Sequence, residues 1–419
     1  MSSIGQEGAD RSILNPGTAD RLICLCLFLV APVFALTSMQ LDYTTTLYRS
    51  FSVPVMVCQL AIIALAFSSR VQPLSALREM PRLVMACIGL WFIGALISTM
   101  GADLQPTASM SLARSLLQLV FGLALYGFIR AEPLTDSWPM LKSLAWGLTV
   151  YTVVVLVFVL IAWDYPGMKW ERVGVGVSSV RTLGTYGVVL AGIGLGASIA
   201  EDARAARYPL IWTTAGLTLV FLSGGRAPFA GVLAALVVTF IIAGAYRRLL
   251  LARVAIASSI AAIPGLLIVP HPFWGLQTIL SRGLDIDNLG DGYSARRWEI
   301  WIATLEVIKQ RPVFGFGEGQ YRFHVIAANP HPQPHNVIMQ VLFEWGIIGA
   351  SAIAVATISG VHWVWRQLDA LPRHVAVALP VVVGILGNAM FDGALFFYFP
   401  VMFFVVALAC MFQPTTVAH

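Results

Sequence analysis

Residues 294–349 read SARRWEIWIATLEVIKQRPVFGFGEGQYRFHVIAANPHPQPHNVIMQVLFEWGIIG and join the only long hydrophilic segment of the chain to the next hydrophobic run. Arg296 and Arg297 open a stretch in which apolar residues recur with helical spacing. Three glycines then predict a flexible turn, and a proline-rich segment holds the chain extended up to His335 and Asn336. We expect these last two residues to lie where the hydrophilic segment becomes a membrane helix.

The composition around this stretch indicates a membrane protein. Of 419 residues, 58% are hydrophobic and only 11% are charged, which is too few charges to cover a water-soluble fold. We therefore predict an all-α polytopic membrane protein of about twelve transmembrane helices, embedded in a lipid bilayer and binding no nucleic acid. The predicted spans are residues 22–39, 51–68, 83–100, 110–129, 143–163, 183–200, 208–223, 228–245, 251–269, 336–364, 373–390 and 394–411.

One long connection divides the predicted chain into three parts. Residues 1–269 would hold transmembrane helices one to nine, and residues 270–335 would form a single long loop that contains short helices. Residues 336–419 would hold the last three transmembrane helices.

The basic residues of the connections predict the orientation. Fourteen Lys and Arg residues fall on the side of the N-terminus and six fall in the short connections on the other side. Because basic residues favour the cytoplasmic side, both termini should be cytoplasmic and the long loop periplasmic, in the inner membrane of a bacterium. The polar N-terminus resembles the start of a signal peptide, but no convincing cleavage site follows it and more spans do, so it is interpreted as an uncleaved first helix.

This orientation brings four candidate residues, Arg181, Arg226, Arg297 and His335, to one membrane surface. Guanidinium groups bind phosphate through paired hydrogen bonds, and a neutral imidazole can take a proton near neutral pH. Several arginines around one possible base are suited to a substrate that carries a pyrophosphate.

Each candidate also has an interpretation without function. Arg296 and Arg297 could extend toward lipid headgroups, and by residue type alone His335 and Asn336 are more often an interfacial histidine and a helix N-cap. His324, His331 and His335 have no cysteine partner and no familiar metal-binding spacing. We therefore predict no metal and no cofactor.

The motifs resemble those of a known family. His335 and Asn336, followed after nine residues by Gly346, are similar to the His-[Asn/Ser/Gln]-x9-Gly signature of the O-antigen ligase and polymerase superfamily. Arg297-x-x-x-Trp301 and the glycine-rich turn PVFGFG precede this signature in the family's order.

The segment SGGRAPFAG around Arg226 completes the resemblance, which covers residues 180–350. The family's usual Ser-Arg-Gly is Gly225-Arg226-Ala227 in this chain. The loop around Arg226 therefore departs from the family pattern.

The resemblance implies metal-independent glycosyl transfer at the periplasmic face, in lipopolysaccharide assembly. The donor would be a glycan on undecaprenyl pyrophosphate, and the acceptor of a ligase would be lipid A-core. His335 would be the general base and Arg226 and Arg297 would bind the pyrophosphate. Arg181, Arg296 and Asn336 would be further substrate-binding residues.

Three other functions remain open from the sequence. A polymerase, which extends the glycan on its carrier lipid, shares these motifs, as do glycoprotein oligosaccharyltransferases of the same superfamily. Twelve spans and one long loop late in the chain favour the ligase. A transporter or flippase would instead place charges and broken helices near the middle of the membrane, where Arg114 and Glu344 are the candidates.

Overall fold

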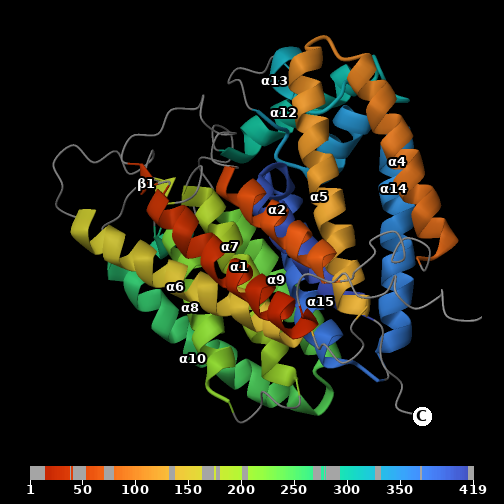
Figure 1. Cartoon of the computed structure of the whole chain (residues 1–419). Coiled ribbons are helices and arrows are strands. Elements are labelled where there is room, and N and C mark those ends of the chain that lie inside the picture. The colour runs from red at the N-terminus through yellow and green to blue at the C-terminus, as the bar shows by residue number, and fades with distance from the viewer. Residues whose placement is uncertain are drawn as a thin grey trace, which may run out of the picture.

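The chain folds into a bundle of long helices with a smaller helical segment at one end (Figure 1). The structure is a computed structural model. It describes residues 15–37, 39–40, 53–69, 80–131, 137–162, 174–175, 180–200, 206–267, 275–277, 279, 293–325, 332–368 and 370–413.

Within these residues, twelve apolar helices coincide with the twelve predicted spans. Seven of them are long and apolar enough to cross a membrane and five are shorter, so the chain is an all-helical, multi-pass membrane protein. Which of the shorter helices cross the bilayer stays a prediction, as does the division into three parts. The twelve helices are α1 (Pro16–Thr37), α2 (Val53–Ser68), α4 (Arg82–Met100), α5 (Gln105–Ala131), α6 (Trp138–Ala162), α7 (Val180–Ile199), α8 (Tyr208–Ser223), α9 (Arg226–Ile242), α10 (Arg247–Leu267), α14 (Val337–Gln367), α15 (Arg373–Ala389) and α16 (Tyr398–Met411).

The remaining elements are short. The loop segment, defined here as residues 293–325, holds α12 (Tyr293–Ile308) and α13 (Tyr321–His324), and two 3-10 turns, η5 (Gly244–Tyr246) and η6 (Ala394–Phe396), precede α10 and α16. Strands β1 (Met39–Gln40) and β2 (Gly174–Val175) form an antiparallel pair in which Met39 faces Val175.

Several helices begin or end a few residues from the predicted spans, and two of these differences have a clear structural reason. The first helix begins at Pro16 rather than at residue 22, because Asn15 caps it with a side-chain hydrogen bond to Gly17 N (3.0 Å). The last helix begins at Tyr398 rather than at residue 394, because extended backbone at Phe397 separates it from η6.

Helix α7 forms the centre of the bundle. It is buried from Thr182 to Ile199 and packs against α8, α9 and α15. A Cβ on Gly187 would come within 2.5 Å of the Gly216 carbonyl oxygen in α8. Small residues at such contacts let membrane helices approach closely, so α7 fixes the positions of its neighbours.

Helix α14 is broken at Gly346, where φ is 60° and ψ is −163°. Such a backbone is accessible essentially only to glycine, and a Cβ there would collide with the Val313 backbone. The break frees two carbonyl groups and two N–H groups, and the glycine-rich turn binds all four. Phe316 N donates to Phe343 O (2.8 Å), Gly317 N to Glu344 O (3.0 Å), Ile347 N to Pro312 O (2.8 Å) and Ile348 N to Val313 O (3.2 Å).

The glycine-rich turn was predicted to be flexible, and in the structure it is packed against α14. Residues 315–317 are buried and Gly315 and Gly317 have positive φ, so the glycines serve close backbone pairing with α14. The turn thus docks the loop segment onto the helix that begins just after His335.

A second set of contacts holds the loop segment on the connection between α4 and α5. Arg311 Nη2 forms an ion pair with Asp103 Oδ1 (2.9 Å). Gln320 both donates to and accepts from the Leu104 backbone at 3.1 Å. Figure 1 shows α12 and α13 next to the upper end of α5, near the connection between α4 and α5.

Candidate functional site

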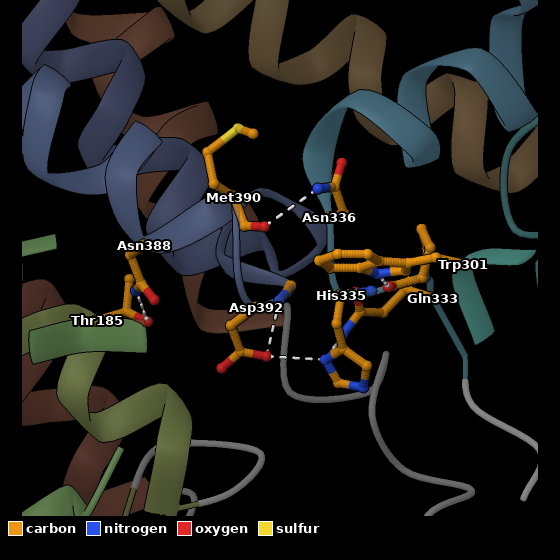
Figure 2. Close-up of polar contacts among 10 residues, drawn as sticks. Thr185, Trp301, Gln333, His335, Asn336, Asn388, Met390 and Asp392 are labelled. Carbon is orange, nitrogen blue, oxygen red and sulfur yellow. Dashed lines mark hydrogen bonds and ion pairs between the residues drawn. The ribbon is translucent and has the colours of Figure 1, made fainter. Parts of the chain in front are cut away.

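His335 lies directly before the Asn336 cap of α14, and Asp392 lies just after the end of α15. The His335 Nδ1 atom is 3.0 Å from Asp392 Oδ1 (Figure 2). Both side chains are largely buried, with 12% and 13% of their surfaces exposed. Gly393 N donates to the same carboxylate oxygen at 2.8 Å, which fixes the orientation of the carboxylate toward the imidazole ring.

Asp392 is ionised at neutral pH. Burial raises the pKa of its carboxyl group. The hydrogen bond to His335, the electrostatic interactions with His335 and Arg297 and the hydrogen bond from the Gly393 N–H together outweigh burial and lower this pKa to about 2. An ionised carboxylate at Nδ1 favours a proton on that nitrogen, which leaves Nε2 as the ring atom that can accept one.

Asn336 joins the two helices of the site. Its side-chain oxygen accepts from Ile338 N (3.0 Å) and Met339 N (3.1 Å) and thereby caps α14. Its amide donates to Met390 O (3.2 Å) at the end of α15. These contacts agree with the interpretation of Asn336 as an N-cap, and its role in substrate binding stays a prediction.

Helix α12 brings Arg297 to this pair. Trp301 Nε1 donates to Pro334 O (3.0 Å), which ties α12 to the segment just before His335. Arg297 lies four residues before Trp301 and therefore on the same helical face. The positive charge of Arg297 helps to lower the pKa of Asp392, so both residues of the Arg-x-x-x-Trp motif lie near the histidine–carboxylate pair.

Arg226 is the exposed first residue of α9. Gly224 ends α8 in a left-handed conformation (φ 60°), and extended Gly225 then starts α9. A Cβ on Gly184 of α7 would come within 2.5 Å of Pro228 Cγ. The first turns of α7 and α9 therefore lie in contact.

Helix α7 also meets α15 next to the site. Asn388 Nδ2 donates to Thr185 Oγ1 at 2.8 Å (Figure 2). Thr185 lies one helical turn after Arg181, and Asn388 lies one turn before Asp392. The two helices are therefore in contact about one turn from Arg181 and from Asp392. The Arg181 side chain lies outside the described residues, so its place in the site stays a prediction.

These contacts define what we call the His335 end of the bundle. Here α7, α9 and α14 begin, α15 ends and α12 packs across. The structure brings together the elements that carry Arg181, Arg226, Arg297 and His335. The side chains of Arg296 and His331 lie outside the described residues, so predictions that involve them are not tested.

Sequence reasoning missed Asp392 and Gln333. Asp392 could have been found, because it is a lone carboxylate in the short connection between the last two predicted spans, on the side predicted for His335. Gln333 carries no comparable signal. It lies in an extended proline-rich segment, and only the fold shows that its side chain contacts His335.

A metal centre does not form among the residues that the structure describes, where no three His, Cys, Asp or Glu side chains gather in a suitable group. His324 instead contacts Asp103 (Nε2 to Oδ2, 3.3 Å). The absence of a metal from the reaction stays a prediction.

The fold defines a multi-pass membrane protein with a histidine–carboxylate pair at one end of its helix bundle. Residues 210–354 match the family model Wzy_C, described as O-antigen ligase. This part of the chain is therefore similar to the Wzy_C domain of the O-antigen ligase and polymerase family. No curated protein matches the chain. The matched segment contains Arg226, Arg297 and His335 and ends before Asp392.

Proposed function

We propose that the protein is an O-antigen ligase, which transfers a glycan from undecaprenyl pyrophosphate to lipid A-core at the periplasmic face of the inner membrane. The observation that carries the proposal is the pair of His335 and ionised Asp392 inside the His335 end. Three helices that begin or pack there carry arginines, and the Wzy_C domain supplies most of these elements.

The transfer needs one proton acceptor and a stabilised leaving group. Nε2 of His335 takes the proton of the acceptor hydroxyl while the hydroxyl oxygen bonds to the anomeric carbon. The bond from that carbon to the pyrophosphate oxygen breaks, and its electron pair leaves with the carrier lipid. Arg226 and Arg297 stabilise the charge that develops on the pyrophosphate, and Asp392 stabilises the imidazolium. The donor is already activated, so the reaction needs neither ATP nor a covalent enzyme intermediate.

An apolar groove on the bundle supports a lipid-borne donor. It has a volume of about 410 Å³ and lies between α9 and α15. Its α9 residues continue the helical face of Arg226 away from the His335 end, since Ala230 lies one turn after Arg226. The groove is lined by Ala230, Leu233, Ala234, Val237, Val238, Ile241 and Val383. A polyprenyl chain in this groove would place its pyrophosphate beside Arg226.

A polymerase would use the same residues with a different acceptor, and the experiment must separate the two. Purified protein in lipid is given lipid-linked glycan with and without lipid A-core. Glycan on the core that depends on His335 supports the ligase. Longer glycan on the carrier lipid, with or without core, would make the protein a polymerase instead.

A transporter is disfavoured by the way in which α14 is broken. The groups freed at Gly346 bind the glycine-rich turn, whereas a transporter would expose such groups to a substrate cavity. A transporter should also lose function in Arg114→Ala and Glu344→Ala at least as severely as in His335→Ala. Glycan transfer by both of the first two variants, with none by the third, would support the enzyme.

A further inference from the structure

Gln333 is a buried side chain, only 2% exposed, between His335 and the turn that follows α15. Its Oε1 atom accepts from the His335 backbone N–H at 2.7 Å, and its Nε2 atom lies 2.9 Å from His335 Nδ1. A Cβ on Gly393 would collide with the Gln333 amide. The glutamine therefore fits tightly against His335 and against Gly393, the residue that follows Asp392, and Figure 2 shows Gln333 beside His335.

The first contact fixes the backbone of the candidate base. His335 has a φ of 56°, in the left-handed region that residues other than glycine rarely adopt. The hydrogen bond from its N–H to Gln333 holds the residue in this conformation and also fixes the amide orientation. Rotating the amide by half a turn would place its NH₂ group against the backbone N–H, and neither group can accept a hydrogen bond.

The second contact opposes the effect of Asp392. The Gln333 N–H can donate only to an Nδ1 that carries no proton, whereas the Asp392 carboxylate, 3.0 Å away, can accept only from an Nδ1 that carries one. Protonation of the ring puts a proton on both nitrogens, so the carboxylate favours the imidazolium and the amide opposes it. Among the described residues, Arg297 is a further charged group near this pair. Its positive charge helps to keep Asp392 ionised.

We propose that Gln333 is a positioning residue for His335, which holds its backbone and keeps the resting imidazole neutral against the pull of Asp392. This inference rests on the proposed function, because a ring protonated on both nitrogens cannot act as a general base. Of the two neutral forms, the one with its proton on Nδ1, toward Asp392, leaves Nε2 free to accept, and the one in which Nδ1 accepts from Gln333 carries its proton on Nε2 and must exchange it before it can act. Asp392 then stabilises the imidazolium as it forms, and Gln333 limits how much of the resting enzyme is already protonated.

Two variants separate the parts of this proposal. Gln333→Met keeps the approximate size of the side chain and removes the opposing N–H without adding charge. Gln333→Glu keeps an oxygen for the His335 backbone N–H and replaces the opposing N–H by an acceptor for Nδ1–H. We expect the pKa of His335 to rise in both variants, and by about one to two units in Gln333→Glu.

The readout does not depend on glycan transfer. Diethyl pyrocarbonate modifies neutral imidazole, so the pH dependence of His335 modification, followed by peptide mass spectrometry on the full-length protein in lipid, reports the pKa of this ring. The matched control is Gln320→Glu, a buried glutamine of the loop segment that bonds the Leu104 backbone. It should leave the His335 titration at its wild-type position.

The outcomes distinguish the two proposals. An unchanged His335 titration in Gln333→Met overturns the role of Gln333, whatever the activity. A raised pKa, with the acid limb of the transfer rate shifted in the same direction, supports it. If the pKa of His335 rises in Gln333→Met but the wild-type protein transfers no glycan to any acceptor, the effect of Gln333 on His335 is supported and the proposed function is rejected.

Discussion

At the scale of single residues, the proposed mechanism depends on the pair of His335 and Asp392. Asp392→Asn would place an amide against Nδ1 and remove the charge that stabilises the imidazolium. We expect kcat to fall roughly 10²- to 10⁴-fold, with donor KM little changed because the arginines remain. The measurement is the rate of transfer at saturating donor. An activity within a factor of three of wild type would exclude Asp392 from the mechanism.

The same carboxylate predicts a pH dependence of stability. Its pKa is lowered from 3.8 to about 2 in the folded protein, so its stabilisation is present above pH 3.8 and is lost as the pH falls through about 2. The shift corresponds to about 2 kcal/mol. Thermal unfolding of wild type and Asp392→Asn should differ at pH 5 and converge toward pH 2. A constant difference across this range would contradict the assigned ionisation.

The arginines predict an effect on donor binding. Arg226→Ala removes an exposed guanidinium at the start of α9, and we expect the KM for the lipid-linked donor to rise roughly 10- to 100-fold. Arg226→Lys should recover only part of this, because the paired hydrogen bonds are lost. Arg322→Ala is the control, since this exposed arginine lies over Phe323 on the loop segment. Equal KM values for Arg226→Ala and wild type would remove Arg226 from the site.

At the scale of elements, the break in α14 makes Gly346 a structural residue. Gly346→Ala must adopt a strained backbone and displace the Val313 backbone, so we expect a loss of about 1–3 kcal/mol or more. The melting temperature in detergent should fall clearly. Gly89→Ala in α4, where a Cβ meets nothing within 4 Å, should remain close to wild type. If both variants melted together, the contact between turn and helix would not contribute to stability.

The sequence predicted the positions of the helices better than the contacts between distant segments of the chain. Hydrophobic runs are local, so each span is recognisable from its own residues. The break at Gly346 was missed because a glycine inside a hydrophobic run does not reveal that a distant turn will bind the freed backbone groups. Asp392 was missed for the same reason, since it lies 57 residues from His335 in the chain. Basic residues placed the arginines on one side, and only tertiary packing showed which elements meet.

At the scale of the whole molecule, we proposed that the groove between α9 and α15 holds the polyprenyl chain of the donor. Val237 is one of the apolar residues that line this groove, and Val237→Trp would fill part of it. We expect a higher KM for the polyprenyl-linked donor and an unchanged kcat at saturation. Val157→Trp is the control, because Val157 is similarly exposed on α6. A short-chain donor should be insensitive to Val237→Trp, and equal effects on both donors would argue against the groove.

The backbone hydrogen bonds between the glycine-rich turn and the break in α14 also have a consequence for biogenesis. The break lies about 14 Å along the helix from its start, and unpaired backbone groups at such a depth in lipid cost several kcal/mol each. The turn at residues 312–317 precedes α14 in the chain, so the ribosome makes it before the helix that needs it. If the loop segment is periplasmic, as we propose, α14 should insert stably only after this turn has been translocated, which couples the export of the loop segment to the integration of the following span.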